Sequence, residues 1–177
     1  MTSAGNPGAQ SRFQVRFGFG AETPVIEGAH VVVWVDALAD PTAQVPTFAG
    51  PAAVVTGGPA ARADIAAWVL DLQARRSDRA TVAVVAAGGT GARFAVEDFV
   101  AAGAVIDALA ELGIDYASPE AAAAAGAWVA LRNAGSHVLS ASVTGQELLA
   151  AGGSLDAARA AWSAAGIRVV REFEGQL

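Results

Sequence analysis

Apolar and polar residues alternate near the start of the chain and then give way to longer apolar runs. In "RFQVRFGFG" the apolar residues alternate with Gln14 and Arg16, a period of two that is typical of a strand with one face toward solvent. This pattern predicts a strand at the edge of a sheet. The next run, "HVVVWVD" from His30 to Asp36, is apolar on both faces. It predicts a strand buried between two layers.

Two segments then repeat the order strand, glycine, helix. The run "AAVVTGG" ends at Gly57 and Gly58, and Pro59 is expected as the first residue of a helix whose apolar positions recur every three or four residues. The run "TVAVVAAGG", Thr81 to Gly89, is followed by a second helical pattern from about Val96 to Leu112. Two such units in succession indicate a mostly parallel sheet covered on both faces.

The last third of the chain predicts two helices and a final strand. Ser118 is the expected N-cap of a helix with Pro119 at its first position and Gly135 at its end. Ser154 is the expected cap of a second helix that ends at Gly166, and "IRVVREF" is the expected last strand. We therefore predict a single α/β domain over residues 12–177, a three-layer α/β/α fold with a mostly parallel or mixed sheet, after a flexible N-terminus over residues 1–11.

Composition narrows the classes of function. The chain has 177 residues, is 54% hydrophobic and has a net charge of −6, with all 11 basic residues arginine and scattered. The absence of a basic stripe argues against nucleic-acid binding. The absence of cysteine excludes disulfides and sulfur ligands, so that a bound cation is expected to be hard and held by oxygen. The start "MTSAGNPGAQSR" has no signal-peptide pattern, and no apolar run reaches the roughly 20 residues that span a bilayer, so we expect a cytoplasmic protein without a membrane partner.

Carboxylates and glycines follow the predicted strands and open the second predicted helix. In a parallel sheet, strand carboxyl ends and helix amino ends meet at one edge, where ligands bind. Carboxylates at this edge suit Mg²⁺, which prefers oxygen ligands and is commonly completed by a substrate phosphate. We therefore predict Asp36, Glu97 and Asp98 as catalytic residues and Mg²⁺ ligands. Glycine-loop amides and two arginines are the predicted phosphate-binding groups: Gly57, Gly58, Arg62, Gly89, Thr90, Gly91 and Arg93.

Structural interpretations of the same residues remain open at this point. Acidic residues in a first helical turn gain about 0.3–1 kcal/mol from the helix dipole without any function. Asp36 can equally begin a turn. The run "GGTG" has neither the dinucleotide-binding spacing nor the lysine of a P-loop. The two histidines, His30 and His137, are isolated, and core packing is the simpler interpretation of the four tryptophans.

Three segments together resemble the 2-phosphosulpholactate phosphatase family: "VVVWVDAL", "AAVVTGGPAARADIAAWV" and "VAVVAAGGTGARFAVEDFVAAGAVIDAL". The strongest part is "RFAVEDFVAAGAVIDAL", which is similar to the family's R-x-A-x-E-D-x-x-x-A-G-A-x-x-x-x-L pattern. A further segment, "SASVTGQELLAAGGSLDAARAA", is similar to its S-x-x-G-x-x-L segment and the helix after it. The resemblance implies an Mg²⁺-dependent phosphatase that acts on a small anionic phosphomonoester, with Arg62 or Arg93 on the phosphate and Asp36 either as nucleophile or as metal ligand.

The sequence departs from the family pattern after Asp36. It has "ALADPT" where the family has an Arg-Ala-Thr/Ser stretch, and it lacks the family's Gly-Asn-Ser-Pro and Thr-Thr-Asn-Gly segments. A second hypothesis is therefore a catalytically degenerate relative that binds a small anion or a protein partner. A third is a homo-oligomeric scaffold, because alanine-rich helices permit close packing.

Overall fold

Five strands form one mixed sheet in the computed structural model of the chain, which describes residues 6–39 and 43–175. Their order across the sheet is β1-β4-β2-β3-β5. The first four strands are parallel, and β5 runs antiparallel to β3. The strands are β1 (Val15–Phe19), β2 (Val31–Val35), β3 (Ala53–Thr56), β4 (Val82–Ala86) and β5 (Arg168–Arg171).

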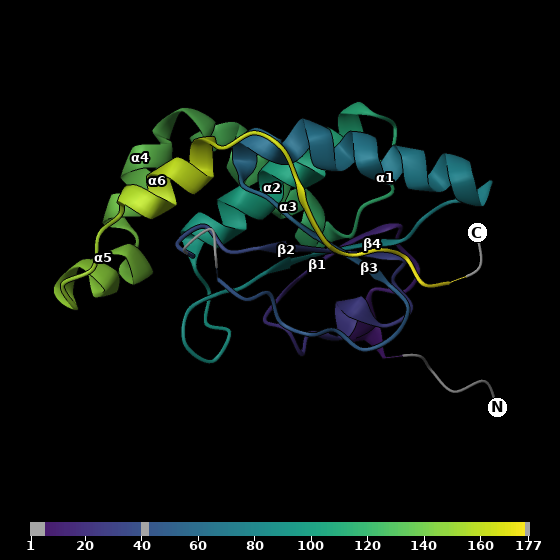
Figure 1. Cartoon of the computed structure of the whole chain (residues 1–177), viewed down its shortest axis with the longest axis horizontal. Coiled ribbons are helices and arrows are strands. Elements are labelled where there is room, and N and C mark those ends of the chain that lie inside the picture. The colour runs from purple at the N-terminus through teal and green to yellow at the C-terminus, as the bar shows by residue number, and fades with distance from the viewer. Residues whose placement is uncertain (1–5, 40–42, 176–177) are drawn as a thin grey trace.

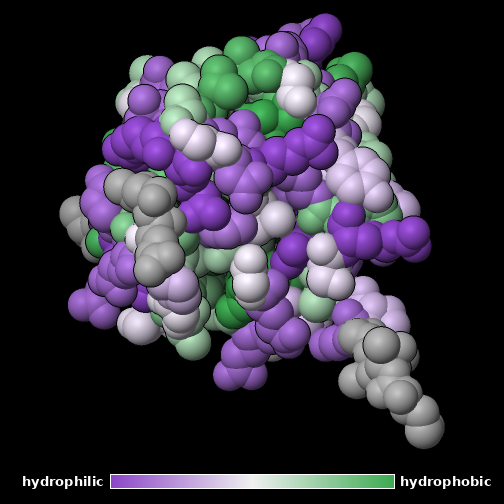
Figure 2. Space-filling view, turned by 90° about the vertical axis from the view of Figure 1, so that its right-hand side faces the viewer, coloured by the Kyte–Doolittle hydropathy of each residue, from purple (hydrophilic) through white to green (hydrophobic). Residues whose placement is uncertain are grey.

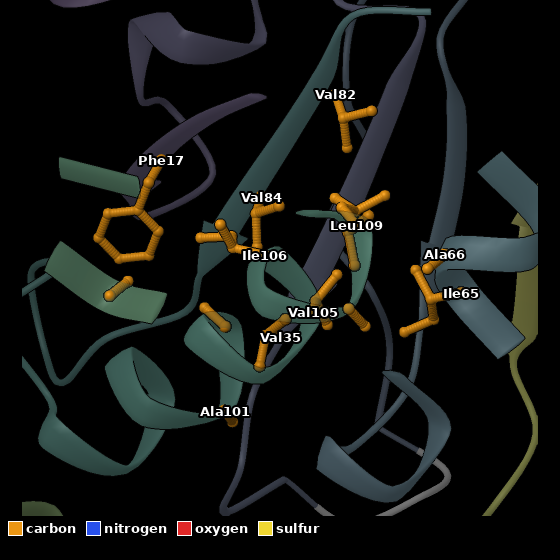
Figure 3. Close-up of a cluster of buried hydrophobic side chains, with 14 of the residues drawn as sticks. Phe17, Val35, Ile65, Ala66, Val82, Val84, Ala101, Val105, Ile106 and Leu109 are labelled. Atoms are coloured by element: carbon orange, nitrogen blue, oxygen red, sulfur yellow. The ribbon is translucent and has the colours of Figure 1, made fainter. Parts of the chain in front are cut away.

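The α-helices of the described residues lie over one face of the sheet and beyond one of its ends (Figure 1). They are α1 (Arg62–Arg76), α2 (Val96–Glu111), α3 (Pro119–Leu131), α4 (Gly135–Ala141), α5 (Val143–Ala150) and α6 (Asp156–Ser163). Helix α2 is central, and its side chains Val105, Ile106 and Leu109 pack against Val82 and Val84 of β4 (Figure 3). Helices α4, α5 and α6 gather at the end of the sheet where the parallel strands finish (Figure 1).

The opposite face of the sheet is covered by a thinner layer. The 3₁₀-helices η1 (Pro7–Ala9) and η2 (Pro24–Ile26), together with coil at 43–52, lie there. Trp34 of β2 and Phe48 of the coil belong to the cluster on this side. The predicted three-layer α/β fold with a mixed sheet is confirmed, and all five residues of β2 are buried, as its apolar pattern indicated.

Strand β1 lies at an edge of the sheet, as predicted, but its polar side chains do not face solvent. The prediction that one face of this strand is exposed to solvent is wrong, because Gln14 and Arg16 are only 9% and 4% exposed. The guanidinium of Arg16 donates hydrogen bonds to backbone carbonyls that include those of Val25 and Glu27, at 3.4 and 2.8 Å. The segment around η2 therefore covers this face and supplies the acceptors that a buried guanidinium needs.

The predicted ends of several elements need correction. Pro59 begins a 3₁₀-helix, η3 (Pro59–Ala61), that leads into α1. Ser118 caps α3 as predicted, but α3 ends at Leu131, and a 3₁₀-helix, η4 (Arg132–Ala134), separates it from α4. Gly135 begins α4 instead of ending α3. The absence of a side chain there makes room for the indole of Trp162.

Two further predictions concern the C-terminal helix and the N-terminus. Helix α6 begins at Asp156 with Leu155 as its N-cap, so the expected cap Ser154 lies one residue too early, and Gly166 lies beyond the helix end at Ser163. Of the N-terminus predicted to be flexible, residues 1–5 lie outside the described residues. Pro7–Ala9 form η1, in which Ala9 is buried.

The surface at the far end of the molecule from α5 is mainly hydrophilic, with small hydrophobic areas (Figure 2). None of the helices in the described ranges has the length and apolar character to cross a membrane.

Helices α2 and α3 approach each other at Gly103. A Cβ added there would lie 2.0 Å from the backbone oxygen of Ala124, well inside van der Waals contact. A side chain at this position would push α3 away from α2, which carries Glu97 and Asp98 in its first turn. The glycine is therefore a packing requirement of the helical layer.

We expect Gly103→Ala to lower the free energy of unfolding by about 1–3 kcal/mol, because the added methyl group overpacks this contact. Gly126→Ala on α3 is the matched control. No atom lies within 4 Å of its added Cβ, and removing a helical glycine gains about 0.5–1 kcal/mol. Denaturant unfolding of the two variants measures both effects, and a stable Gly103→Ala protein would contradict the proposed close approach.

Candidate functional site at the carboxyl edge of the sheet

Asp98 connects the ends of two neighbouring strands. Its carboxylate is 3% exposed and lies in the first turn of α2. One oxygen, Oδ1, accepts the backbone N–H of Ala37 at 2.7 Å, just after β2. The other, Oδ2, accepts the backbone N–H of Gly88 at 2.8 Å, just after β4. Both oxygens of Asp98 therefore hold the loops of the site in place.

Glu97 is even more deeply buried, at 1% exposed, but only one of its two carboxylate oxygens has a hydrogen-bond partner among the described residues. Its Oε1 accepts a hydrogen bond from the Thr144 hydroxyl of α5. Its Oε2 is buried and has no hydrogen-bond partner among the described residues. Buried charged oxygens are normally paired or coordinate a metal. The Oε2 atom of Glu97 is therefore the atom at this edge where a partner would be expected.

The corner between α4 and α5 positions Thr144 against Glu97. Ser142 caps α5 by accepting the backbone N–H of Gly145 at 3.0 Å. A Cβ on Gly145 would lie 2.0 Å from the backbone oxygen of Leu139, so only glycine lets α5 turn this closely against α4. These two residues therefore build the turn that brings the Thr144 hydroxyl to the carboxylate.

Asp36 follows β2 and is partly buried. Its Oδ1 accepts the backbone N–H of Leu38 at 3.3 Å. Burial raises the pKa of Asp36, the hydrogen bonds from Leu38 and Ala39 lower it, and the negative charge of Glu97 raises it. The carboxylates predicted from sequence are thus close enough to repel one another.

The same repulsion acts on Asp98. Burial raises its pKa to about 7, the hydrogen bonds from Ala37 and Gly88 oppose the shift, and the charges of Asp36 and Glu97 add to it. A proton or a cation relieves the cluster, because buried like charges disfavour joint ionisation.

The two predicted phosphate-binding arginines have partners other than the carboxylates, and Arg93 and Thr144 both pack against Gly89. Arg93 forms an ion pair with Glu147 of α5 at 2.7 Å. The guanidinium of Arg62 lies over the Trp128 ring, 5.5 Å from its centroid. Both arginines are therefore engaged elsewhere.

The glycine turns also serve packing. A Cβ on Gly58 would lie 2.2 Å from the backbone oxygen of Ala161, so this glycine admits α6. Gly57 likewise packs close to the Ala61 and Ile65 side chains. Gly89 exchanges two backbone hydrogen bonds with Arg93, at 2.8 and 3.2 Å, which closes the loop that exposes Thr90 and Gly91.

A cavity of about 380 Å³ lies beside Asp36 at the ends of β2 and β3. Its lining includes Asp36, Gly57 and Gly58, but neither Glu97, Asp98 nor the loop at 88–93. Asp36 therefore belongs both to the carboxylate cluster and to the cavity wall, and the loop at 88–93 is joined to the carboxylates through the hydrogen bond from Gly88 to Asp98.

A family model described as 2-phosphosulpholactate phosphatase matches residues 46–174, more than two thirds of the chain. The chain belongs to this family. No curated protein and no solved structure matches it. The family match includes Glu97, Asp98 and Thr144 but begins after Asp36.

The family resemblance raises the question of whether these residues fit a cation. Within residues 6–39 and 43–175, no group of three or more histidine, cysteine or acidic side chains is arranged to hold a metal ion. Each oxygen of Asp98 already accepts a backbone N–H. Mg²⁺ often uses only one or two carboxylates together with water and substrate phosphate. Glu97, with its free Oε2, and Asp36 fit that smaller set of ligands.

Three residues at the site are not predicted from the sequence. Thr144 bonds Glu97, Glu147 pairs with Arg93, and the guanidinium of Arg168 lies in the cavity wall. A signal existed for the first of these. Thr144 lies inside the "SVTG" segment that matches the family's S-x-x-G-x-x-L pattern, whose Ser142 and Gly145 build the corner. Nothing in the local sequence indicated that β5 would bring Arg168 to the cavity.

We expect Asp98 to make stability depend on pH in the absence of divalent cations. Its pKa is raised from 3.8 to about 7, so the folded chain binds more protons than the unfolded chain between these values. The free energy of unfolding therefore falls as pH rises from about 4 to about 7, by at most about 1.4 kcal/mol per pH unit.

Denaturant unfolding between these pH values tests this prediction. Asp98→Asn does not titrate and leaves one backbone N–H facing an amide NH₂. It should be less stable than wild type at pH 4, with a gap that narrows as pH rises. The exposed Asp71→Asn on α1, which loses an ion pair to Arg75 worth about 0.3–0.5 kcal/mol, is the control. Parallel pH profiles for wild type and Asp98→Asn would refute the assignment.

Proposed function

We propose that this chain is a divalent-cation-dependent phosphatase that hydrolyses a small phosphomonoester. The observation that carries the proposal is the buried Oε2 of Glu97, which has no partner among the described residues. Family membership supports phosphatase chemistry. The mutual repulsion of Asp36, Glu97 and Asp98 supports a cation in their midst.

The three carboxylates divide two tasks in this proposal. Glu97 and Asp36 would hold Mg²⁺, and Thr144 fixes the Glu97 rotamer by its hydrogen bond to Oε1. Asp98 positions the loops after β2 and β4, so that Asp36 stays beside the first turn of α2. When bound, Mg²⁺ supplies positive charge that offsets the charge of the phosphoryl oxygens.

Hydrolysis balances with water as the only co-reactant. The water oxygen forms a bond to phosphorus while the ester O–P bond breaks, and the ester oxygen leaves with the bonding electron pair. That oxygen gains one proton, and the products are an alcohol and inorganic phosphate. Such transfers depend mainly on positioning and on neutralising charge, which is what paired carboxylates with a cation provide.

A second candidate function is a non-catalytic anion- or protein-binding relative. The observation that counts against turnover is that Arg62 and Arg93, the predicted phosphate ligands, are engaged with Trp128 and Glu147. Without a cation, a phosphate at the carboxylates would meet net negative charge. Phosphate binding at this edge therefore requires the divalent ion.

We expect Mg²⁺ to stabilise the wild-type chain. Binding to the folded state alone raises the free energy of unfolding by about 1.4 kcal/mol when the free ion is at about ten times its Kd. Glu97→Gln should abolish this increment. Without Mg²⁺ this variant should be more stable than wild type, because an unpaired buried charge is removed.

The matched control is Glu120→Gln, which makes the same change in the exposed first turn of α3. It should keep the Mg²⁺ increment. Thermal unfolding of the three proteins, each with EDTA and with Mg²⁺, measures all these differences. An equal Mg²⁺ effect on wild type and Glu97→Gln would place the cation elsewhere.

Turnover tests the activity itself. Wild type should release inorganic phosphate from p-nitrophenyl phosphate in Mg²⁺ and not in EDTA, and Glu97→Gln should lower kcat/KM by about 100-fold or more, as loss of charge stabilisation does. Glu120→Gln should match wild type. Absence of turnover with a broad panel of phosphomonoesters would favour the non-catalytic alternative.

A further inference from the structure

Helix α5 contacts the start of α2 and the loop before it through two side chains. Thr144 donates a hydrogen bond to Oε1 of Glu97, and Oε2 of Glu147 accepts one from Nη2 of Arg93 at 2.7 Å. Thr144 and Glu147 are three residues apart, so they share one face of the helix. Helix α5 lies beyond the end of the sheet where the parallel strands finish (Figure 1). One face of α5 therefore contacts both a proposed cation ligand and an arginine.

The guanidinium of Arg93 lies close to the proposed cation site. A Cβ added to Gly89 would lie 3.1 Å from Nε of Arg93 and 3.1 Å from Cγ2 of Thr144, so these two atoms are at most about 6 Å apart. Thr144 in turn bonds Glu97. Arg93 is thus near enough to the carboxylate edge to meet an anion that is bound there.

The ion pair with Glu147 uses only part of the guanidinium. Among the described residues, Arg93 makes this one hydrogen bond, through Nη2. A guanidinium has five N–H donors in a fixed fork, and a phosphate can accept two of them side by side. The Arg93 and Glu147 side chains are 46% and 56% exposed, and exposed ion pairs of this kind are weak. A phosphate dianion can therefore compete with Glu147 for Arg93.

The charges at this edge change when a substrate arrives. In the free chain, Glu147 neutralises Arg93 beside the carboxylates Asp36, Glu97 and Asp98. This leaves the edge negative, which favours a cation. A phosphate that follows the cation brings negative charge of its own, and a guanidinium released from Glu147 would offset part of it.

We infer that Glu147 occupies Arg93 in the free protein and that the phosphate of the substrate takes its place, so that Glu147 sets the affinity of the site for anions. The inference rests on the proposed function where turnover is concerned. The exchange itself requires only that the site bind phosphate. Glu147 acts through Arg93 and is not in contact with the reacting atoms in this scheme.

Glu147→Gln tests the exchange, because it keeps the shape of the side chain and removes its charge. Calorimetric titration with inorganic phosphate in the presence of Mg²⁺ should show a Kd that is lower than that of wild type by about two- to fivefold, the range measured for exposed ion pairs. KM for p-nitrophenyl phosphate should fall by the same factor with kcat unchanged, because the lost competition affects ground state and transition state equally.

The substitution Arg93→Gln shows whether the gain depends on the arginine. Alone, it should raise the Kd for phosphate by about tenfold or more, as loss of charged hydrogen bonds does. Adding Glu147→Gln to this variant should then change nothing, whereas general repulsion of phosphate by Glu147 would persist without Arg93.

Asp156→Asn is the matched control. It removes another exposed ion pair, the one between Asp156 and Arg159 on α6. Because neither residue belongs to the site, the Kd for phosphate should stay that of wild type.

The outcomes separate this inference from the phosphatase. The expected pattern of Kd values without turnover of any phosphomonoester would support the exchange and overturn the phosphatase. Mg²⁺-dependent turnover with a Kd and a KM that neither substitution alters would leave the phosphatase standing and overturn the exchange. The exchange is also wrong if Glu147→Gln weakens phosphate binding, if its gain persists in the Arg93→Gln background, or if wild type does not bind phosphate.

Discussion

The two hydrogen bonds that Asp98 accepts from Ala37 and Gly88 determine the shape of the carboxyl edge. They connect the loops after β2 and β4, which are neighbours in the sheet, to the first turn of α2. Because charge-assisted bonds of this kind are short and strong, they offset part of the cost of burying the carboxylate. Asp36, the neighbour of Ala37, takes its position from this connection.

The carboxylates at this edge are buried, which is unfavourable for the stability of the fold unless each is paired. Asp98 has its partners, but Glu97 is left with a buried oxygen that nothing among the described residues satisfies. A buried polar group without a partner needs an explanation, and under the proposed function that partner is a cation. The cavity whose lining includes Asp36 lies beside the cluster at the same edge of the sheet.

Much of the fold follows from local patterns. The apolar runs located all five strands, and the E-D pair marked the start of α2 at Val96. The site was only partly predictable. The approach of Asp36, Glu97 and Asp98 to one another follows from the parallel strands, whose carboxyl ends meet at one edge. The roles of Asp98 and Gly58 depend on distant backbone atoms, those of Gly88, Ala37 and Ala161, which no local pattern reveals. Arg16 was misjudged for the same reason, because η2 covers it from another part of the chain.

The pairing of β5 with β3 joins residues that are more than a hundred positions apart, such as Val54 and Arg171. Contacts of this separation form slowly, since a long loop must close before they gain anything. The parallel strands and α2 are joined by contacts of shorter separation. The wall of the cavity, in contrast, includes Arg168 of β5, so the cavity takes its shape only once these distant segments have paired.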